Sequence, residues 1–298
     1  MTSVGVIGLG KMGLPIARNL LERGFPVTGY RRTPVDELTA LGGTFAGSPG
    51  EVAAASTVII SILPDVDALR EVVLGPDGTA AHLRPGTVHI EMSTLDVDAK
   101  QVLRDVVRDR GGDMLDCPIS GTPAMVAPRA ATTFASGEPA CVDAVRQVLD
   151  AISGPWVYAG AFGSGARLKY VANLLVAVHT VATAEALLLA HRSGLDLKLV
   201  QDAVSGSIAG STIWDRRGPL VAGRTWTPAP GPIGTLHLIL EQIEAQAGAT
   251  GTTLPVFAAA KDLFDKAVAE GWSDLDIAAV HDQLSGQDPF QHDEEDTP

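Results

Sequence analysis

Apolar and polar positions follow two different patterns over roughly the first 160 residues. Short apolar runs rich in β-branched residues, beginning with residues 3–9, indicate buried strands, whereas helical spacing of apolar residues, beginning with residues 14–23, indicates helices. Further strands are predicted at residues 27–30, 57–63, 87–92 and 114–117, with candidate edge strands at 130–135 and 156–158. Helices are predicted after the cap and proline of Ser48-Pro49 and over residues 96–110. This alternation is typical of a doubly wound, mostly parallel α/β sheet.

The pattern changes after residue 165. Residues 166–193 form one apolar helical stretch that ends at Gly194 and is too apolar for a surface helix, so we expect it to be buried between domains or subunits. More helices are predicted at residues 196–205, 211–221, 233–247, 254–270 and 273–284. The chain should therefore comprise an α/β domain at 1–162, an all-α domain at 163–285 containing the long helix (about 164–193), and a disordered acidic tail at 286–298.

A glycine-rich turn follows the first predicted strand and has the sequence Gly8-Leu9-Gly10-Lys11-Met12-Gly13. In a strand–turn–helix–strand unit the first glycine permits a tight turn, the second lets the backbone approach a pyrophosphate, and the third lets helix and strand pack closely. The next helix offers free N–H groups to the phosphates. A plain structural turn is the alternative. The flanking elements favour a dinucleotide-binding Rossmann domain in which every residue of this turn contacts the cofactor.

The second predicted strand ends in Arg31-Arg32-Thr33, where a site that prefers NAD would place a carboxylate for the ribose 2′-hydroxyl. Arginines suit a 2′-phosphate because they donate bidentate, charge-assisted hydrogen bonds. A solvated pair of arginines is the alternative. We predict NADPH or NADP⁺ as the cofactor, bound by Arg31, Arg32 and Thr33. Two further strand ends are candidates to line the nicotinamide half of the groove, namely Leu63-Pro64-Asp65 and Ser93-Thr94.

Charge and composition argue against several classes of partner. The 298 residues carry a formal net charge of −13, which argues against nucleic acids and anionic membrane surfaces. No uninterrupted apolar run reaches the roughly 18 residues of a membrane span, and no export signal precedes the first strand, so we expect a cytoplasmic protein. Cys117 and Cys141 are expected to be reduced thiols. The histidines show no metal-ligand spacing, so no metal site is predicted.

Lys169 and Asn173 lie four residues apart on the long predicted helix, so they share one face among apolar neighbours. A buried lysine is costly unless it is paired or functional. Its desolvation would lower the pKa and suit the side chain to proton transfer near neutral pH. A lysine that snorkels to the edge of the helix is the alternative.

Residues 116–122 end a predicted strand with a proline and the small polar sequence Ser120-Gly121-Thr122. Ligands of open α/β sheets lie beyond the carboxyl ends of the strands. We expect these three residues to offer a hydroxyl and backbone N–H groups to a substrate carboxylate. Taken alone, the sequence also fits an ordinary loop.

The glycine-rich turn, residues 116–121 and residues 163–173 together resemble, in order and spacing, the three signatures of the β-hydroxyacid dehydrogenase family. That family includes 3-hydroxyisobutyrate dehydrogenase and tartronate semialdehyde reductase and is related to the imine reductases. The resemblance runs from residue 3 to about residue 285 and implies a Rossmann domain followed by an all-helical domain. It also implies site roles: Lys169 as the catalytic lysine, Asn173 orienting substrate, Ser120 and Gly121 holding its carboxylate, and Thr94 at the cofactor ribose.

The chain departs from the family pattern at positions that bind substrate. Thr122 stands where the family often has a second glycine, Ala172 where it has a first asparagine, and residues 129–131 where it has Gly-Thr-Leu. A Lys-Asp pair expected in the helical half is missing, and an ungapped alignment places His237 near it. We expect His237 and Trp214 to contact the substrate.

These observations predict an NADPH-dependent oxidoreductase that acts on the carbonyl or alcohol of a small, carboxylate-bearing 3-hydroxy acid or semialdehyde. Lys169 would serve as general acid or base. The alternative is an imine reductase on the same fold, and a less favoured one is a non-catalytic NADPH-binding protein. The expected partners are a small-molecule substrate and further copies of the chain, as a homodimer or homotetramer, with neither nucleic acid nor membrane.

Overall fold

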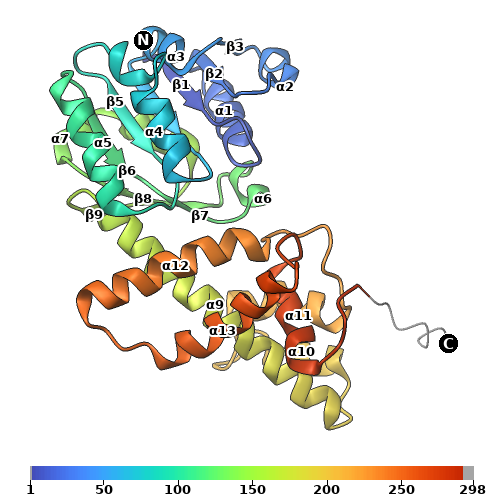
Figure 1. Cartoon of the computed structure of the whole chain (residues 1–298). Coiled ribbons are helices and arrows are strands. Elements are labelled where there is room, and N and C mark those ends of the chain that lie inside the picture. The colour runs from blue at the N-terminus through green and yellow to red at the C-terminus, as the bar shows by residue number, and fades with distance from the viewer. Residues whose placement is uncertain (1, 291–298) are drawn as a thin grey trace. The chain divides into compact units, whose positions relative to one another are not determined.

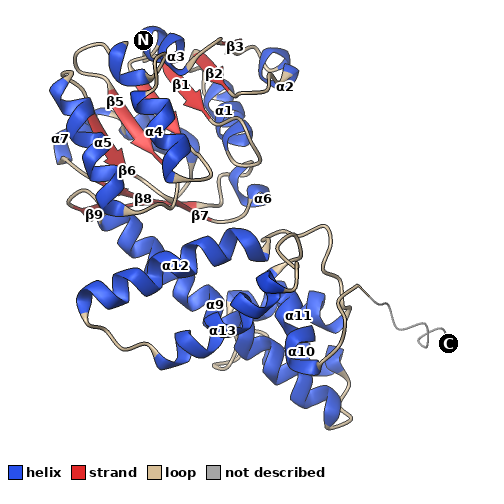
Figure 2. Cartoon of the chain, viewed as in Figure 1, coloured by secondary structure: helices blue, strands red, loops and turns tan. Residues whose placement is uncertain are grey.

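Residues 2–290 are described by a computed structural model (Figure 1). The chain divides into two compact units, Met1–Lys169 (unit 1) and Tyr170–Pro298 (unit 2). Every strand that the structure describes lies in unit 1, and unit 2 is built from helices (Figure 2). The domain limits predicted from the sequence stay a prediction, and residues 291–298 of the predicted acidic tail lie outside the described residues.

The sheet of unit 1 has the strand order β3-β2-β1-β4-β5-β6-β8-β7, and β9 pairs with β8. The pairs from β3 to β6 are parallel, β8 is antiparallel to β6 and β7, and β9 is parallel to β8. The strands are β1 (Val4–Ile7), β2 (Val27–Tyr30), β3 (Thr44–Phe45), β4 (Val58–Ser61), β5 (Val88–Glu91), β6 (Asp113–Asp116), β7 (Ile119–Ser120), β8 (Thr132–Ser136) and β9 (Trp156–Gly160). From β1 the chain extends the sheet first on one side and then on the other, so β1 and β4 flank a topological switch point, where such sheets bind ligands.

Helices cover both faces of this sheet. They are α1 (Gly13–Glu22), α2 (Asp36–Ala40), α3 (Pro49–Ala55), α4 (Val66–Leu74), α5 (Val97–Asp109), α6 (Pro123–Val126), α7 (Pro139–Ala144), α8 (Arg146–Ile152) and the 3₁₀ turn η1 (Thr79–Ala81). One buried cluster joins Ile16 of α1 and Leu149 of α8 to Val6 of the sheet, and another joins α4 and α5 to Met114. Each such fully buried side chain contributes about 1.5–3 kcal/mol.

The doubly wound, mostly parallel sheet predicted from the sequence is confirmed, and several shorter elements were not predicted. The missed strands β3 and β7 each span two residues, too few to show any periodicity. The missed helix α4 is capped by Asp65, whose carboxylate accepts the N–H of Ala68 at 2.7 Å. The predicted cap at Ser48 is present, because its hydroxyl accepts the N–H of Glu51 at 3.1 Å.

Unit 2 follows the predicted series of helices. The long helix α9 (Ser164–Arg192) begins in unit 1 and continues into unit 2, where it ends before Gly194, which has a φ of +72°. The others are α10 (Leu197–Val204), α11 (Thr212–Ala222), α12 (Ile233–Thr250), α13 (Pro255–Ala269), η2 (Ile277–Ala279) and α14 (Val280–Ser285). The all-α second half predicted from the sequence is confirmed.

The last predicted helix, at residues 273–284, begins later than expected. Asp276 is extended, with φ −61° and ψ 147°, and caps the 3₁₀ turn by accepting the N–H of Ala278 at 3.0 Å. Its carboxylate also accepts the N–H of Gly231 at 2.9 Å and pairs with Arg217. These contacts hold residue 276 out of the helix, so helical geometry starts at Ile277.

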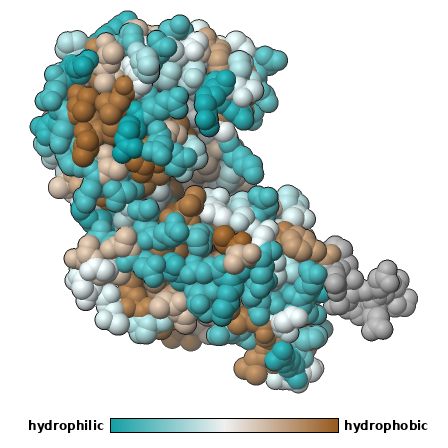
Figure 3. Space-filling view, in the orientation of Figure 1, coloured by the Kyte–Doolittle hydropathy of each residue, from teal (hydrophilic) through white to brown (hydrophobic). Residues whose placement is uncertain are grey.

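Helix α9 is the one helix within residues 2–290 that is long and apolar enough to cross a membrane, judged by length and composition alone. Its most apolar window has a mean hydropathy of 1.6. Polar residues within the helix explain why the sequence alone shows no uninterrupted apolar run as long as a membrane span. The core helix of a soluble protein passes the same test. Apolar side chains also reach the surface of α9, among them Val171, Leu175 and Leu189, and Figure 3 shows apolar side chains on the surface of both units.

Exposed apolar side chains on α9 predict self-association, because monomeric proteins rarely leave large apolar patches in water. We expect the 30.9 kDa chain to form a dimer or tetramer at micromolar concentration. Sedimentation velocity measures this directly. Replacing Leu189 by glutamate should shift the distribution toward the monomer, whereas Val102→Glu, at an equally exposed position of α5, should not. A monomeric wild-type protein would contradict the prediction.

Candidate active site

The glycine-rich turn joins β1 to α1 and contains two kinds of glycine. Gly8 has a φ of +98°, and a Cβ there would lie 2.1 Å from the carbonyl oxygen of Ile62. A Cβ on Gly13 would lie 2.0 Å from the carbonyl oxygen of Gly8, so folding itself requires both glycines. A Cβ on Gly10 would meet no atom of the chain within 4 Å. The absence of a side chain at Gly10 therefore fits the close approach of a ligand.

The N-terminus of α1 is open to an anion. Met12, at the cap position, makes no side-chain capping bond, and the first turn contains no acidic residue. The first N–H groups of a helix have no partner within it, and the helix dipole favours negative charge there. The turn and the helix together fit a dinucleotide pyrophosphate.

A cavity of about 440 Å³ adjoins this turn in unit 1. Its wall includes many of the predicted cofactor contacts: Gly8, Leu9, Gly10, Arg31, Arg32, Thr33, Leu63 and Pro64. Four other predicted contacts, Lys11, Met12, Gly13 and Asp65, are not part of this wall, and neither is Thr94. Sequence reasoning missed other residues of this wall, among them Ser48 and Pro49 at the start of α3, and Glu71 and Asp77.

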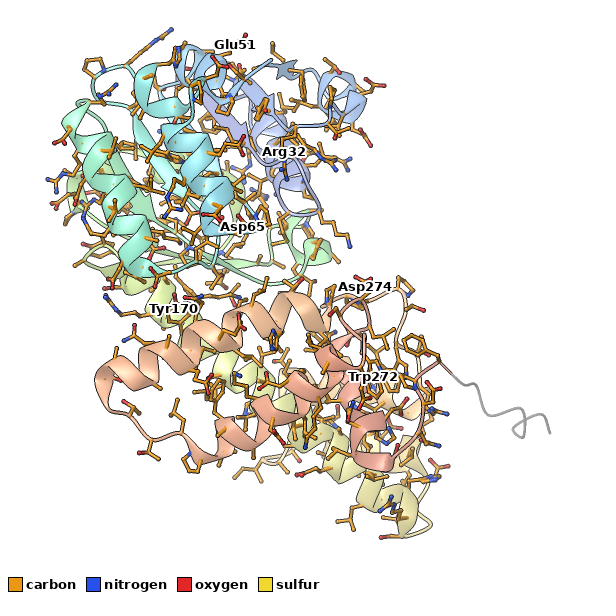
Figure 4. The ribbon with its side chains drawn as sticks, viewed as in Figure 1. Arg32, Glu51, Asp65, Tyr170, Trp272 and Asp274 are labelled. Atoms are coloured by element: carbon orange, nitrogen blue, oxygen red, sulfur yellow. The ribbon has the colours of Figure 1, made fainter. Side chains whose placement is uncertain are left out.

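The two predicted phosphate-binding arginines lie directly after β2 and are exposed on the cavity wall. The Arg31 guanidinium lies 3.5 Å from the carbonyl oxygen of Leu9, which ties it to the glycine-rich turn. Arg32, labelled in Figure 4, has no described hydrogen bond or ion pair within residues 2–290. Its guanidinium is therefore available to an anionic group in the cavity.

The ends of β4 and β5 are connected to each other. The Ser93 hydroxyl accepts the N–H of Leu63 at 2.8 Å, which places the loop containing Thr94 beside the cavity residue Leu63. Asp65 (Figure 4) uses its carboxylate to cap α4, so its described role is structural. Thr94 is half-buried, and its hydroxyl makes no described hydrogen bond within residues 2–290.

Lys169 is a buried basic side chain of unit 1. Unlike Lys100 and Arg104, it has no carboxylate partner among the described residues. Its side chain lies in the second turn of α9, and the residue is 8% exposed. Burial lowers the pKa of Lys169 from its usual range to about 8. The Nζ atom lies 3.4 Å from the Ser120 hydroxyl, so the structure brings together two of the predicted site residues.

The turn that follows Ser120, the last residue of β7, packs against a small side chain. Gly121 has a φ of +155°, and a Cβ there would lie 2.8 Å from the Cβ of Ala131. Ala131 belongs to the segment where the chain departs from the family pattern, and its small side chain fits directly against Gly121. Thr122 begins α6 in an extended conformation without a side-chain capping bond. Its hydroxyl is available to a ligand.

The remaining predicted substrate contacts belong to unit 2. Asn173 lies one helical turn after Lys169 on the continuous helix α9. Trp214 is buried within unit 2, and its indole N–H donates to the carbonyl oxygen of Gln201 at 3.2 Å. The His237 Nε2 lies 2.9 Å from a carboxylate oxygen of Asp265, which also binds Lys261 at 2.8 Å. The substrate roles of these three residues stay predictions.

A buried charged group beside the site was missed from the sequence. Lys100 of α5 is fully buried, and its Nζ lies 2.9 Å from Asp116, in contact with Glu91, and 2.5 Å from the carbonyl oxygen of Ser93. The signal was present, because Lys100 lies three residues from both Val97 and Leu103 on the apolar face of its helix. A charged residue on the apolar face of a helix indicates that it pairs with an opposite charge inside the protein.

Comparison with known proteins gives matches along almost the whole chain. A family model described as the NAD binding domain of 6-phosphogluconate dehydrogenase matches residues 3–160. A second, described as the NAD-binding domain of NADP-dependent 3-hydroxyisobutyrate dehydrogenase, matches residues 163–284. The mitochondrial 3-hydroxyisobutyrate dehydrogenase of Mus musculus is 31% identical over 297 residues, which cover 97% of this chain and 89% of that protein.

Solved structures agree with these matches. A 3-hydroxyisobutyrate dehydrogenase from Salmonella typhimurium superposes with a TM-score of 0.86 at 28% identity, covering 95% of this chain and all of that one. A Streptomyces aurantiacus imine reductase gives a TM-score of 0.63 at 25% identity, with 95% and 99% coverage. The fold and these matches define an NAD(P)-dependent oxidoreductase. The chain belongs to the β-hydroxyacid dehydrogenase family, of which 3-hydroxyisobutyrate dehydrogenase is a member, as the sequence motifs predicted.

The open space at Gly10 predicts that a methyl group there blocks the cofactor and leaves the fold intact. We expect Gly10→Ala to weaken NADPH binding by about tenfold or more, equal to about 1.4 kcal/mol, without lowering the melting temperature. Fluorescence titration and thermal unfolding measure the two effects. Gly248→Ala is the matched control, because that glycine of α12 also has no atom within 4 Å. Unchanged NADPH affinity in Gly10→Ala would show that the cofactor does not approach this turn.

Proposed function

We propose that this enzyme reduces the carbonyl group of a small, carboxylate-bearing semialdehyde or oxo acid with NADPH, and oxidises the corresponding 3-hydroxy acid in reverse. The observation that carries the proposal is Lys169, a buried lysine with a lowered pKa beside the Ser120 hydroxyl. It lies on a helix that begins at the carboxyl edge of the sheet, the edge where such folds hold their ligands. A small-molecule substrate is thus the proposed partner.

The proposed chemistry divides among few residues. A nicotinamide dinucleotide, when bound, supplies or accepts a hydride. The Lys169 ammonium donates a proton to the substrate oxygen during reduction and, as the neutral amine, removes it during oxidation. Ser120, the N–H groups near Gly121, and the Thr122 hydroxyl bind the substrate carboxylate, while Asn173 orients the substrate. Burial of Lys169 favours this role, because it brings the pKa close to working pH.

Imine reduction is the second candidate, and the departures from the family pattern favour it. The position near the family's C-terminal lysine carries His237, whose imidazole is already bound to Asp265. Loss of that lysine weakens the case for an acid substrate, and the likeness to an imine reductase extends over the same length of chain. The presence of Lys169 favours carbonyl reduction instead. NADPH oxidation assayed in parallel with aldehydes, oxo acids and cyclic imines separates the two, and oxidation with none of them would favour the non-catalytic alternative.

Lys169→Ala should lower kcat by about 10²–10⁴-fold, because proton transfer is lost from the transition state. NADPH affinity should change little, since the cofactor turn at Gly8–Gly13 belongs to a different part of unit 1. Asn173→Ala should cost less, because Asn173 orients the substrate without transferring a proton. Steady-state kinetics and NADPH fluorescence measure these effects. A Lys169→Ala enzyme that retains more than about a tenth of its turnover would remove Lys169 from the mechanism and favour imine reduction.

The titration of Lys169 should make the rates of reduction and oxidation depend on pH. Reduction needs the protonated amine, so kcat/KM for reduction should fall as pH rises through about 8, and the rate of oxidation should rise over the same range. Lys169→Arg is the control, because arginine keeps the charge but does not titrate there. The break near pH 8 should be missing from whatever activity Lys169→Arg retains. A wild-type profile that is flat from pH 7 to 9 would contradict this assignment.

A preference for NADPH follows from the arginines of the cavity wall. Arg32→Gln should lower kcat/KM for NADPH by about ten- to a hundredfold, since a charge-assisted bond to the 2′-phosphate contributes about 1.5–3 kcal/mol. The value for NADH should barely change. Arg23→Gln, at an exposed position outside the cavity, is the matched control. Equal efficiency of the wild type with NADH and NADPH would refute the preference.

A further inference from the structure

The first turn of α9 is held by side chains that lie outside the helix, all within unit 1. Asp116, the last residue of β6, accepts the N–H of Ala166 through Oδ2 at 2.8 Å. The Ser136 hydroxyl accepts the N–H of Gly165 at 2.9 Å and itself donates to Asp116. Because the first N–H groups of a helix have no partner inside it, these bonds determine where and in which direction α9 begins.

A buried cation holds the other oxygen of Asp116. Lys100 Nζ lies 2.9 Å from Oδ1, and the same ammonium contacts Glu91 and the carbonyl oxygen of Ser93. Burial acts to lower the pKa of Lys100, but the negative charges of Asp116 and Glu91 outweigh it and raise the pKa. Lys100 therefore stays charged and keeps the second oxygen of Asp116 directed at the backbone of α9.

The same face of α5 makes two further contacts with the segment that enters α9. The Arg104 guanidinium lies 4.8 Å from the centre of the Phe162 ring. A Cβ on Gly163 would lie 2.5 Å from a methyl carbon of Val97, so this glycine sits directly against α5. Val97, Lys100 and Arg104 lie at helical spacing on one side of α5. The start of α9 is thus seated against α5 on one side and the end of β6 on the other.

Asp116 also lies just before β7, which ends at Ser120, the residue whose hydroxyl lies 3.4 Å from Lys169 Nζ. We propose that Asp116, held by Lys100, is a positioning residue for Lys169, because it fixes both the helix that carries the lysine and the start of the segment that leads to Ser120 in β7. The inference rests on the proposed role of Lys169. Asp116 acts through the backbone of α9 and takes no part in proton transfer.

Two isosteric substitutions separate positioning from simple stabilisation. Asp116→Asn and Glu91→Gln each remove one carboxylate from Lys100, but only Asp116 binds α9. Lys100 and the N–H of Ala166 both donate to Asp116, each to a different oxygen. An asparagine has only one side-chain oxygen, and its NH₂ group cannot accept a hydrogen bond, so one of the two contacts is lost. Glu91 contacts Lys100 and accepts the N–H of Ser93 at 2.8 Å, and it makes no described bond to α9. Glu91→Gln is therefore the milder change for the start of α9.

The expected results differ between the two variants. Asp116→Asn should lower kcat by about 10–100-fold, the cost of a misplaced catalytic group, while the KM for NADPH changes little. NMR of the full chain labelled with ¹³C-lysine, with Lys169 assigned from Lys169→Arg, should show its pKa rising toward the ordinary lysine value as the side chain gains water. Glu91→Gln should keep both the rate and the Lys169 signal near the wild type.

A second pair of variants keeps all the buried charged residues in place. Ser136→Ala removes the hydroxyl that binds Gly165, and Ser153→Ala removes an equally buried hydroxyl that donates to Thr133 at 2.9 Å. Ser136→Ala should shift the Lys169 signal in the same direction as Asp116→Asn, by a smaller amount, and Ser153→Ala should not. This pair decides the question if Asp116→Asn fails to fold.

Equal effects within each pair, or an unchanged Lys169 signal in folded Asp116→Asn and Ser136→Ala, would overturn the inference. These outcomes differ from a failure of the proposed function. Retained turnover in Lys169→Ala would remove Lys169 from catalysis, whereas the NMR titration reports its environment whether or not the lysine is catalytic.

Discussion

A buried ammonium that stays charged well above neutral pH needs an opposite charge beside it, and Lys100 imposes this condition on the carboxyl edge of the sheet. Its ammonium binds groups at the ends of β5 and β6, and Ser93 extends the connection to Leu63 after β4. Removing one partner of such a pair costs about 3–5 kcal/mol, so the strand ends are fixed relative to one another. One set of contacts thereby connects the cavity wall at Leu63 with the helix that carries Lys169.

Elements with a strong period could be predicted from the sequence, and elements defined by tertiary contacts could not. The buried strands β1 and β4 are rich in β-branched residues, and their positions were found to within a few residues. The start of the last helical segment was misplaced because Asp276 takes up contacts with Arg217 and Gly231, residues far away in the sequence. Local patterns carry no information about such partners, which exist only once unit 2 is folded.

The candidate site shows the same division. The glycine-rich turn and the arginines after β2 are local motifs, and the structure places them together on one cavity wall. Lys169 and Ser120 are separated by many residues, and the family resemblance rather than periodicity linked them before the structure showed their proximity. Glu71 and Asp77, which line the same cavity, carry no motif and were missed. Asp65 caps α4 and Trp214 is buried in unit 2, and their predicted site roles stay predictions.

The three glycines of the β1–α1 turn are constrained by different neighbours. Gly8 and Gly13 lie against backbone oxygens of the chain itself, so any descendant that keeps this fold must keep them. A side-chain carbon at Gly10 would meet no described atom of the chain within 4 Å, so the cost of replacing this glycine would come from a bound molecule. A lineage that stopped binding the dinucleotide would therefore be free to change Gly10 while Gly8 and Gly13 stayed constant. The identity of this one residue thus records whether an ancestral binding function is still in use, separately from whether the protein still folds.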